Sequence, residues 1–318
     1  SIMENTGIQY ITTGDTQRGQ MNSYHSSARY GHKDLSKGAK STDIAQLRSA
    51  QRGNLTTMDC GDFKSKFTIG FEIEKSSMSR GAIREYALFS GFERDSSCGY
   101  EAVTNILPLL PASTWRNKVY SMMHDASRII EDRYSPSNSR CGGHMTFAVE
   151  GMTGEELNTA IRPFAGIVLA LFRKRLKNSY CSGNVMMTQG YGRYQMCLVK
   201  DSVVEFRLPS RIQSVKQMMR RYELMYELLN QAVNNPNGSP AKFLQKVKPI
   251  VKSMYAGEEL KTNAILHIAT GFNKMLKTGK VNRTILNYVD PMRRMDADEM
   301  YDADLRRNGH ESCETHRV

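Results

Sequence analysis

Two glutamates stand two positions apart in the segment KFTIGFEIEK, residues 66–75. The alternation of this segment predicts a β-strand with one apolar face, and Glu72 and Glu74 share the other face with Gly70. Side chains in this relation lie about 6.6–7 Å apart, and acidic residues are poor strand formers. The pair fits either an exposed strand edge, where charge discourages aggregation, or a set of ligands for a cation.

Two further predicted strands carry a polar residue on an otherwise apolar segment. In ERDSSCGYEAVTNILPL, residues 93–109, Glu101 stands at the head of the strand. In CGGHMTFAVE, residues 141–150, His144 follows two glycines that allow the backbone to approach a ligand closely. Taken singly, Glu101 fits an exposed strand end and His144 fits an ordinary surface or core histidine.

The fourth strand of this kind is VVEFRLPSR, residues 203–211, in which Glu205 and Arg207 share one face. Alone, they fit a cross-strand ion pair of little energetic value. If the four polar faces converge on one sheet, however, several carboxylates meet an imidazole and cannot all stay ionised without cations. Such an oxygen-rich site suits Mg²⁺ or Mn²⁺, which in turn bind nucleotide phosphates. The candidate metal ligands are Glu72, Glu74, Glu101, His144 and Glu205.

The elements that must position these residues follow from hydrophobic periodicity and capping signals. Strands are predicted at 66–74, 100–109 and 142–150, with two more between 194 and 210. Helices are predicted at 81–90, 113–133, 153–177 with a kink at Pro163, 211–234, 240–254 and 257–277. The expected division is a loop-rich or partly disordered arm over 1–62, a catalytic core over 63–210, a helical region over 211–290 and a charged tail over 291–318.

Composition limits the class of protein and its partners. The chain has 318 residues, 40% of them hydrophobic, which is enough for a substantial core, and its net charge of +12 suits anionic partners. Nucleic acid is a possible but not a favoured partner, because no helix-turn-helix, zinc-finger or RNP motif is present. The longest apolar run, around residues 164–172, is too short to span a bilayer, and the sequence shows no signal peptide at its start. The six cysteines are scattered, which is typical of reduced thiols in the cytosol. We therefore expect a cytoplasmic protein without a membrane partner.

In order and spacing, the four polar segments resemble those of the glutamine-synthetase-like carboxylate–amine ligases, and in particular the amidoligase branch. The matching motifs are GFEIE at 70–74, DSS followed by GYE, CGGH at 141–144 and VEFRLP. They extend over residues 66–211, close to half of the chain. Family members often carry a second histidine two residues after the first, and Thr146 stands at that position here.

The resemblance implies an α+β fold, in which a curved, mainly antiparallel sheet forms a funnel packed by helices and is followed by a helical C-terminal region. It implies that Glu74 and Glu101 hold one divalent ion, and that Glu72, His144 and Glu205 hold another near the phosphates of ATP. The resemblance also implies that Arg207, which lies next to Glu205, stabilises the phosphoryl group while it is transferred. Further candidates for contact with phosphate or carboxylate are Arg193, Arg211 and Lys200.

The expected function is therefore that of an ATP- and Mg²⁺-dependent ligase, which joins a carboxylate to an amine through an acyl phosphate. A peptide or an amino acid is the kind of substrate expected. Two alternatives stay open. One is a protein on a degenerate ligase fold that binds nucleic acid or a partner through the basic helices of 211–277, and the other is a metal-dependent hydrolase. The sequence specifies neither substrate, nor the oligomeric state.

Overall fold

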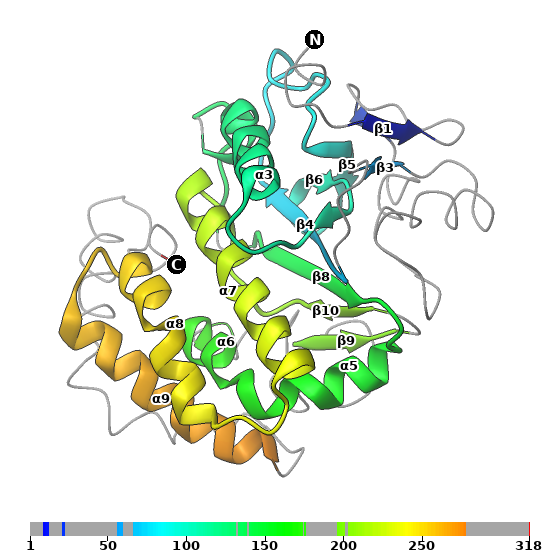
Figure 1. Cartoon of the computed structure of the whole chain (residues 1–318). Helices are drawn as coiled ribbons and strands as arrows, with labels where there is room; N and C mark the ends of the chain where they lie inside the picture. The colour runs from blue at the N-terminus through cyan, green and yellow to red at the C-terminus, as the bar shows by residue number, and fades with distance from the viewer. Residues whose placement is uncertain are drawn as a thin grey trace. The chain divides into compact units, whose positions relative to one another are not determined.

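The computed structural model describes residues 9–12, 21–22, 56–59, 66–131, 133–138, 140–173, 175, 196–200, 203–277 and 318. The chain forms two compact units. The first comprises Ser1–Leu157, Lys200–Glu205 and Arg211–Met219, and the second comprises Asn158–Val199, Phe206–Ser210 and Arg220–Val318. The fold is of the α+β class, with a mostly antiparallel open sheet and helices (Figure 1). The boundaries that the sequence predicts between arm, core, helical region and tail, at residues 62, 210 and 290, stay a prediction.

The first unit is built on a sheet with the strand order β2-β5-β6-β4-β8-β10, in which β7 also pairs with β4. The strands are β2 (Met21–Asn22), β4 (Phe67–Lys75), β5 (Phe89–Asp95), β6 (Gly99–Thr104), β7 (Leu107–Pro108), β8 (Gly143–Val149) and β10 (Val204–Phe206). Strand β4 is antiparallel to β6, β7 and β8, and β5 is antiparallel to β6, whereas β2 and β5 are parallel. A separate antiparallel pair consists of β1 (Gln9–Thr12) and β3 (Thr56–Asp59).

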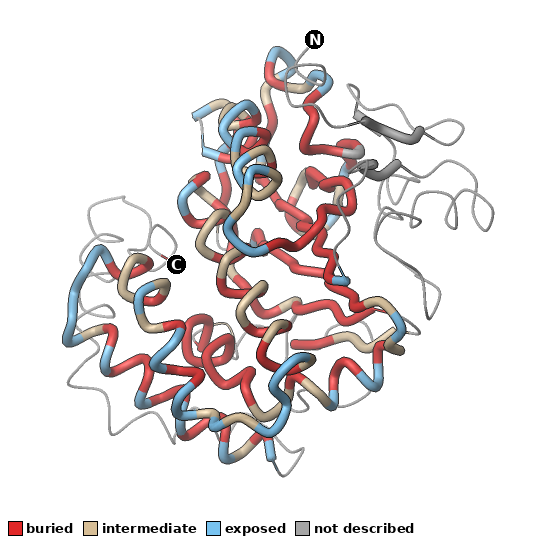
Figure 2. The backbone as a smooth tube through the Cα atoms, in the orientation of Figure 1, coloured by how far each residue is buried: buried red, intermediate tan, exposed pale blue. Residues whose placement is uncertain are grey.

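Strand β4 lies in the interior of this sheet and is buried along its whole length, as is β8 (Figure 2). The prediction of a strand at this place is confirmed. The expectation of a half-exposed strand is wrong, because Glu72 and Glu74 are only 8% and 7% exposed. An exposed, charge-protected strand edge therefore does not explain the two glutamates.

The end of β4 contacts the helical segment that the sequence predicts at 113–133, because Nζ of Lys75 donates to the carbonyl of Ile130 at 2.8 Å. The segment forms two helices, α3 (Thr114–Asp125) and α4 (Ser127–Ile130), with a break at Ala126. The hydroxyl of Ser113 caps α3 by accepting a hydrogen bond from the amide of Arg116 at 3.1 Å. Strands β4, β6 with β7, and β8 likewise lie where periodicity predicts them.

The predicted helix at 81–90 is wrong. This segment forms turns that lead into β5, a strand that the sequence analysis does not predict. Tyr86, Phe89 and Phe92 are almost fully buried, and their rings pack against one another with centroids 5.4–6.2 Å apart. A helix of ten residues is marginal by itself, so the burial of these rings and the pairing of β5 with β6 outweigh its local propensity.

The second unit is mainly helical. The predicted helix at 153–177 is interrupted at Pro163, as expected: α5 (Gly154–Ile161) ends in the 3₁₀ turn η2 (Arg162–Phe164), and α6 (Gly166–Leu171) follows. The later helices are α7 (Val215–Asn234), α8 (Pro240–Met254) and α9 (Glu259–Lys277). Both α5 and α7 begin in the first unit. Gly166 allows close packing of α6 on α9, because a Cβ at this position would lie 2.4 Å from the carbonyl oxygen of Ala269.

The second unit also contains β9 (Cys197–Val199), and the amide of Arg207 donates to the carbonyl of Met196 at 2.8 Å. The two strands predicted between 194 and 210 are thus present as β9 and β10. None of the helices in the described part of the chain has the length and apolar character needed to cross a bilayer.

We expect Gly154→Ala to destabilise the first unit by about 1–3 kcal/mol, although alanine is the better helix former. The added Cβ would lie 1.9 Å from the carbonyl oxygen of Lys200 and 2.6 Å from that of Val203. Chemical denaturation measures the effect. Gly81→Ala is the matched control, because the nearest atom to its Cβ is 4.0 Å away. Equal stability of the two variants would contradict the close approach of Gly154 to the backbone of Lys200 and Val203.

The buried Lys75 predicts a specific dependence of stability on pH. Its ammonium group donates to the carbonyls of Ile130 and Ile212 at 2.8 and 2.9 Å, and burial, with a smaller effect of Arg211, lowers its pKa to about 8. Between this value and the ordinary pKa of 10.5 the unfolded chain binds more protons, so the free energy of unfolding rises with pH. From about pH 7.5 to about pH 9.5 we expect wild type to gain roughly 2 kcal/mol relative to Lys75→Met. Parallel pH profiles in urea unfolding would contradict this expectation.

Candidate metal centre

The register of the sheet brings the predicted ligands onto one face. Glu72 on β4 lies directly opposite His144 on β8, and Glu74 on β4 lies directly opposite Glu101 on β6. Directly opposed residues of an antiparallel pair have Cβ atoms about 4.5–5.5 Å apart, so their side chains meet. Glu205 is carried by β10, which neighbours β8.

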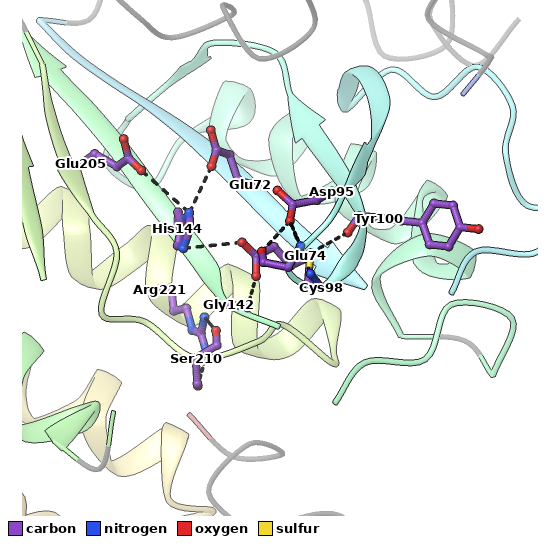
Figure 3. A network of polar contacts seen from close by, with 11 residues as sticks. Glu72, Glu74, Asp95, Cys98, Tyr100, Gly142, His144, Glu205, Ser210 and Arg221 are labelled. Atoms are coloured by element: carbon purple, nitrogen blue, oxygen red, sulfur yellow. Dashed lines mark hydrogen bonds and ion pairs between the residues drawn. The ribbon is translucent and has the colours of Figure 1, made fainter. Parts of the chain in front are cut away.

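His144 is the centre of the group (Figure 3). Its Nδ1 lies 3.1 Å from Oε2 of Glu72 and 3.8 Å from Oε1 of Glu205, and its Nε2 lies 3.7 Å from Oε1 of Glu74. One ligand atom from each of Glu72, His144 and Glu205 can be chosen so that all three lie within 4.8 Å of one another. Three carboxylates from two strands, β4 and β10, therefore converge on the imidazole of His144 on β8.

Burial gives this group its electrostatic character. Glu72, Glu74, His144 and Glu205 are each less than 9% exposed, and Glu101 is 1% exposed. Glu74 is held in place by the amide of Gly142, which donates to its Oε2 at 2.6 Å. Carboxylates that are this close and this little hydrated repel one another strongly unless positive charge or protons compensate them.

Lys200 supplies one positive charge at the edge of the group. Its Nζ donates to Oε2 of Glu205 at 2.7 Å, and its side chain is 25% exposed. The sequence analysis proposes Lys200 as a contact for phosphate or carboxylate, and the structure places it beside a predicted metal ligand. The backbone of Lys200 lies close to Gly154, where an added Cβ would be 1.9 Å from the Lys200 carbonyl oxygen.

The donor set fits a divalent metal ion. Carboxylate oxygens with a single imidazole are ligands that Mg²⁺ and Mn²⁺ accept. Donor atoms around one such ion lie roughly 3–4 Å apart, which the spacing of Glu72, His144 and Glu205 allows. Glu74 contacts the other ring nitrogen of His144 and so can orient the imidazole, as partners of metal ligands commonly do.

The sequence analysis does not identify Glu93, a further buried acid on the same face. Glu93 on β5 lies opposite Glu101 on β6 and is only 1% exposed. With Glu74, these residues form a row of three carboxylates across β4, β6 and β5. Glu93 is the first residue of the segment 93–109. Because β5 is not predicted from the sequence, Glu93 could not be assigned to the same face as Glu74 and Glu101.

Asp95 has a structural role beside this row. Its Oδ1 accepts hydrogen bonds from the amides of Ser97 and Cys98 at 2.7 and 3.3 Å, in the turn that joins β5 to β6. Gly99 ends this turn with φ of +118°, and a side chain there would lie 2.8 Å from the carbonyl oxygen of Ser76. The motif DSS therefore fixes the connection that brings Glu93 and Glu101 into register.

The three predicted arginines differ in what the structure describes of them. Arg211 belongs to the first unit, is 3% exposed, and is close enough to Lys75 to contribute to the lowering of its pKa. Arg207 belongs to the second unit, at the end of β10. Arg193 lies outside the described residues. Their roles in binding phosphate stay predictions.

Part of the basic character of the helical region is neutralised internally. Lys248 and Lys252 on α8 both pair with Glu259 on α9, at 2.6 and 2.8 Å, and Lys246 pairs with Glu227 at 3.3 Å. Hydrogen bonds from Lys248 and Lys252 lower the pKa of Glu259 to about 2. Two glutamates thus compensate most of the charge of these three lysines.

No model of a known protein family matches the chain, and no curated protein matches its sequence. The resemblance to the amidoligases rests on the four motifs and stays a prediction.

We expect Lys200→Gln to have two opposite effects. Without the ammonium group Glu205 loses a partner, so the metal-free protein should be destabilised by about 1–3 kcal/mol. The binding of Mn²⁺, which must share Glu205 with Lys200, should become about tenfold tighter or more, because a like charge nearby opposes a cation. Calorimetric titration with Mn²⁺ measures the affinity, with the exposed Lys66→Gln as the control. Weaker Mn²⁺ binding by Lys200→Gln alone would show that Lys200 does not compete for the site.

Proposed function

We propose that the protein is an ATP-dependent carboxylate–amine ligase of the amidoligase type, with Mg²⁺ or Mn²⁺ as its cofactor. The observation that carries the proposal is the buried group of Glu72, His144 and Glu205, whose ligand atoms lie within 4.8 Å of one another. The glutamine-synthetase-like funnel belongs to the same proposal. Support for it comes from the α+β architecture with its mostly antiparallel sheet, in which the predicted ligands share one face.

The chemistry requires charge neutralisation more than any other aid. A carboxylate is a poor electrophile, and it becomes reactive when the γ-phosphoryl group of ATP is transferred to one of its oxygens. An amine then attacks the carbonyl carbon, and phosphate leaves. When bound, the divalent ion would supply positive charge at the phosphates and hold them in line for transfer.

In the proposal, each residue of the group has a separate role in this chemistry. Glu72, His144 and Glu205 would hold the ion, and Glu74 keeps the His144 ring in its orientation. Lys200 lies beside Glu205 with a quarter of its side chain exposed, so it can reach an anionic substrate without leaving the site. In the proposal, Arg207 stabilises the phosphoryl group in transfer.

The burial of the group favours a ligase over a hydrolase. An acyl phosphate reacts readily with water, so a ligase must keep water from its reacting centre. The side chains of Glu205, His144 and Glu72 are 4%, 6% and 10% exposed, and Lys200 at 25% is the most exposed member of the group. A metal-dependent hydrolase, in contrast, needs a water molecule at the reacting centre. We therefore rank it second among the candidate functions.

Nucleotide binding is tested by thermal shift with Mg²⁺ and a non-hydrolysable ATP analogue. At a concentration of about 100 times Kd, the analogue should stabilise wild type by about 2.7 kcal/mol. Glu72→Gln and Glu205→Gln should lose most of this shift, because each removes a ligand charge. Glu155→Gln, an exposed carboxylate on α5, should retain it. The absence of any shift in wild type at millimolar nucleotide would overturn the proposal.

The reaction class is tested by product formation. With ATP, a panel of carboxylic acids and hydroxylamine as a general amine, a ligase yields hydroxamate and ADP in equal amounts. ADP formation that does not depend on the amine would assign a hydrolase. The Glu155→Gln variant should be active and Glu205→Gln inactive in the same assay.

A further inference from the structure

The carboxylate of Glu205 lies between the imidazole of His144 and the ammonium group of Lys200. Its Oε1 lies 3.8 Å from Nδ1 of His144, as Figure 3 shows, and its Oε2 accepts a hydrogen bond from Nζ of Lys200 at 2.7 Å. The side chain of Glu205 is only 4% exposed. One oxygen of this carboxylate therefore faces the group that can hold a metal ion, and the other faces a positive charge.

Lys200 can change its partner while its backbone stays in place. Its amide donates to the carbonyl of Val203 at 3.0 Å, whereas its ammonium group is carried on a flexible four-carbon stem. In the described part of the chain, Glu205 is the one carboxylate with which Lys200 pairs. A quarter of the Lys200 side chain is exposed, so the ammonium group lies at the boundary between the buried site and solvent.

A divalent ion held by Glu72, His144 and Glu205 would compete with Lys200 for the charge of Glu205. Two cations on one carboxylate repel each other, and the repulsion is strong where little water screens it. Occupation of the site would therefore weaken the pair of Lys200 with Glu205. A partly buried ammonium group that loses its carboxylate needs another anion, because an unpaired charge at such a position is costly.

The proposed chemistry limits which anion can take this place. The carboxylate that accepts the phosphoryl group must attack phosphorus through one of its oxygens, and pairing with an ammonium group lowers the reactivity of that oxygen. A second carboxylate on the same substrate does not react, so it can pair with Lys200 and hold the substrate in position. An acid with two carboxyl groups meets both requirements.

We propose that the acid substrate is a dicarboxylic acid, and that Lys200 binds its non-reacting carboxylate when a divalent ion is bound to Glu205. In the metal-free protein Lys200 neutralises Glu205, and the affinity for the acid is low. Ion and acid therefore bind cooperatively, and each raises the affinity for the other by the same factor. This inference rests on the proposed function, from which it takes the metal centre and the acid substrate.

Calorimetric titration of the full chain with glutarate, with and without saturating Mn²⁺, tests the coupling. Butyrate has one carboxyl group and so measures any direct contact of a carboxylate with the ion. In wild type, Mn²⁺ should raise the affinity for glutarate by a factor at least ten times larger than the factor for butyrate. Lys200→Gln should lose this difference, and the exposed Lys66→Gln should keep it. An equal gain for both acids in wild type, or an undiminished difference in Lys200→Gln, would overturn the proposal.

A second variant tests the role of Lys200 without a metal ion. Glu205→Gln keeps the size of the side chain but removes the charge that holds Lys200. The metal-free Glu205→Gln protein should therefore bind glutarate at least tenfold more tightly than metal-free wild type does. The double variant with Lys200→Gln should lose this gain, and Glu155→Gln, an exposed carboxylate on α5, should bind glutarate as wild type does. A folded Glu205→Gln protein with no gain in affinity would contradict the proposal.

The outcomes separate this proposal from the proposed function. If wild type binds Mn²⁺ but shows no preferential gain for glutarate, the role of Lys200 is wrong and the metal centre is retained. If folded wild type binds no Mn²⁺, the metal centre and the coupling are both wrong. A gain for glutarate that depends on Lys200, both with Mn²⁺ in wild type and without it in Glu205→Gln, is the result expected here.

Discussion

The need to balance buried negative charge governs the first unit. Carboxylates from β4, β5, β6 and β10 share a face with His144, and nearly all of their area is removed from water. Lys200 compensates one of them, and the amide of Gly142 stabilises another. In the proposed function, a bound divalent ion would supply positive charge to these close and buried carboxylates.

The opposite face of the same strand shows how the structure treats charge where no cation is needed. Lys75 ends the apolar row of β4, and its ammonium group is bound by the carbonyls of Ile130 and Ile212. Neutral oxygens with partial negative charge are sufficient there, although the pKa of the amine falls to about 8. Backbone carbonyls thus stabilise the buried cation of Lys75, whereas on the acidic face the ammonium group of Lys200 and the amide of Gly142 each stabilise one carboxylate.

Hydrophobic periodicity predicts those helices and strands that bury one face, or all of their residues, over several positions. Strand β4, helix α3 with its Ser113 cap, and the long helices α7, α8 and α9 lie within a few residues of their predicted positions. Strand β5 is missed, because it depends on pairing with β6 and on the mutual packing of Tyr86, Phe89 and Phe92, whereas local propensity there favours a helix. The break at Pro163 is predicted, because it follows from the missing amide hydrogen and the fixed φ of proline.

The alternation of polar and apolar residues indicates which residues share one face of a strand, and the site is predictable to that extent. Glu72, His144 and Glu205 could be grouped from the sequence because each interrupts an apolar segment. Glu93 could not, because its strand was not recognised. The contact of Lys200 with Glu205 could not be predicted either, because no pattern of alternation pairs the two residues. The burial of Arg221 on α7 is equally hidden, since an arginine on an amphipathic helix is ordinarily exposed.

The pairing of β4 with a neighbour on each side has a consequence for how this gene can vary. Adjacent residues of β4 alternate between the acidic layer and the hydrophobic one, and both β6 and β8 read that alternation in register. A single inserted or deleted codon within 67–75 would exchange the two faces on one side of the change. Carboxylates would then enter the hydrophobic core, and phenylalanines would lie on the acidic face. Viable length changes in this strand should therefore come in pairs of codons, or be absorbed in the turns outside it.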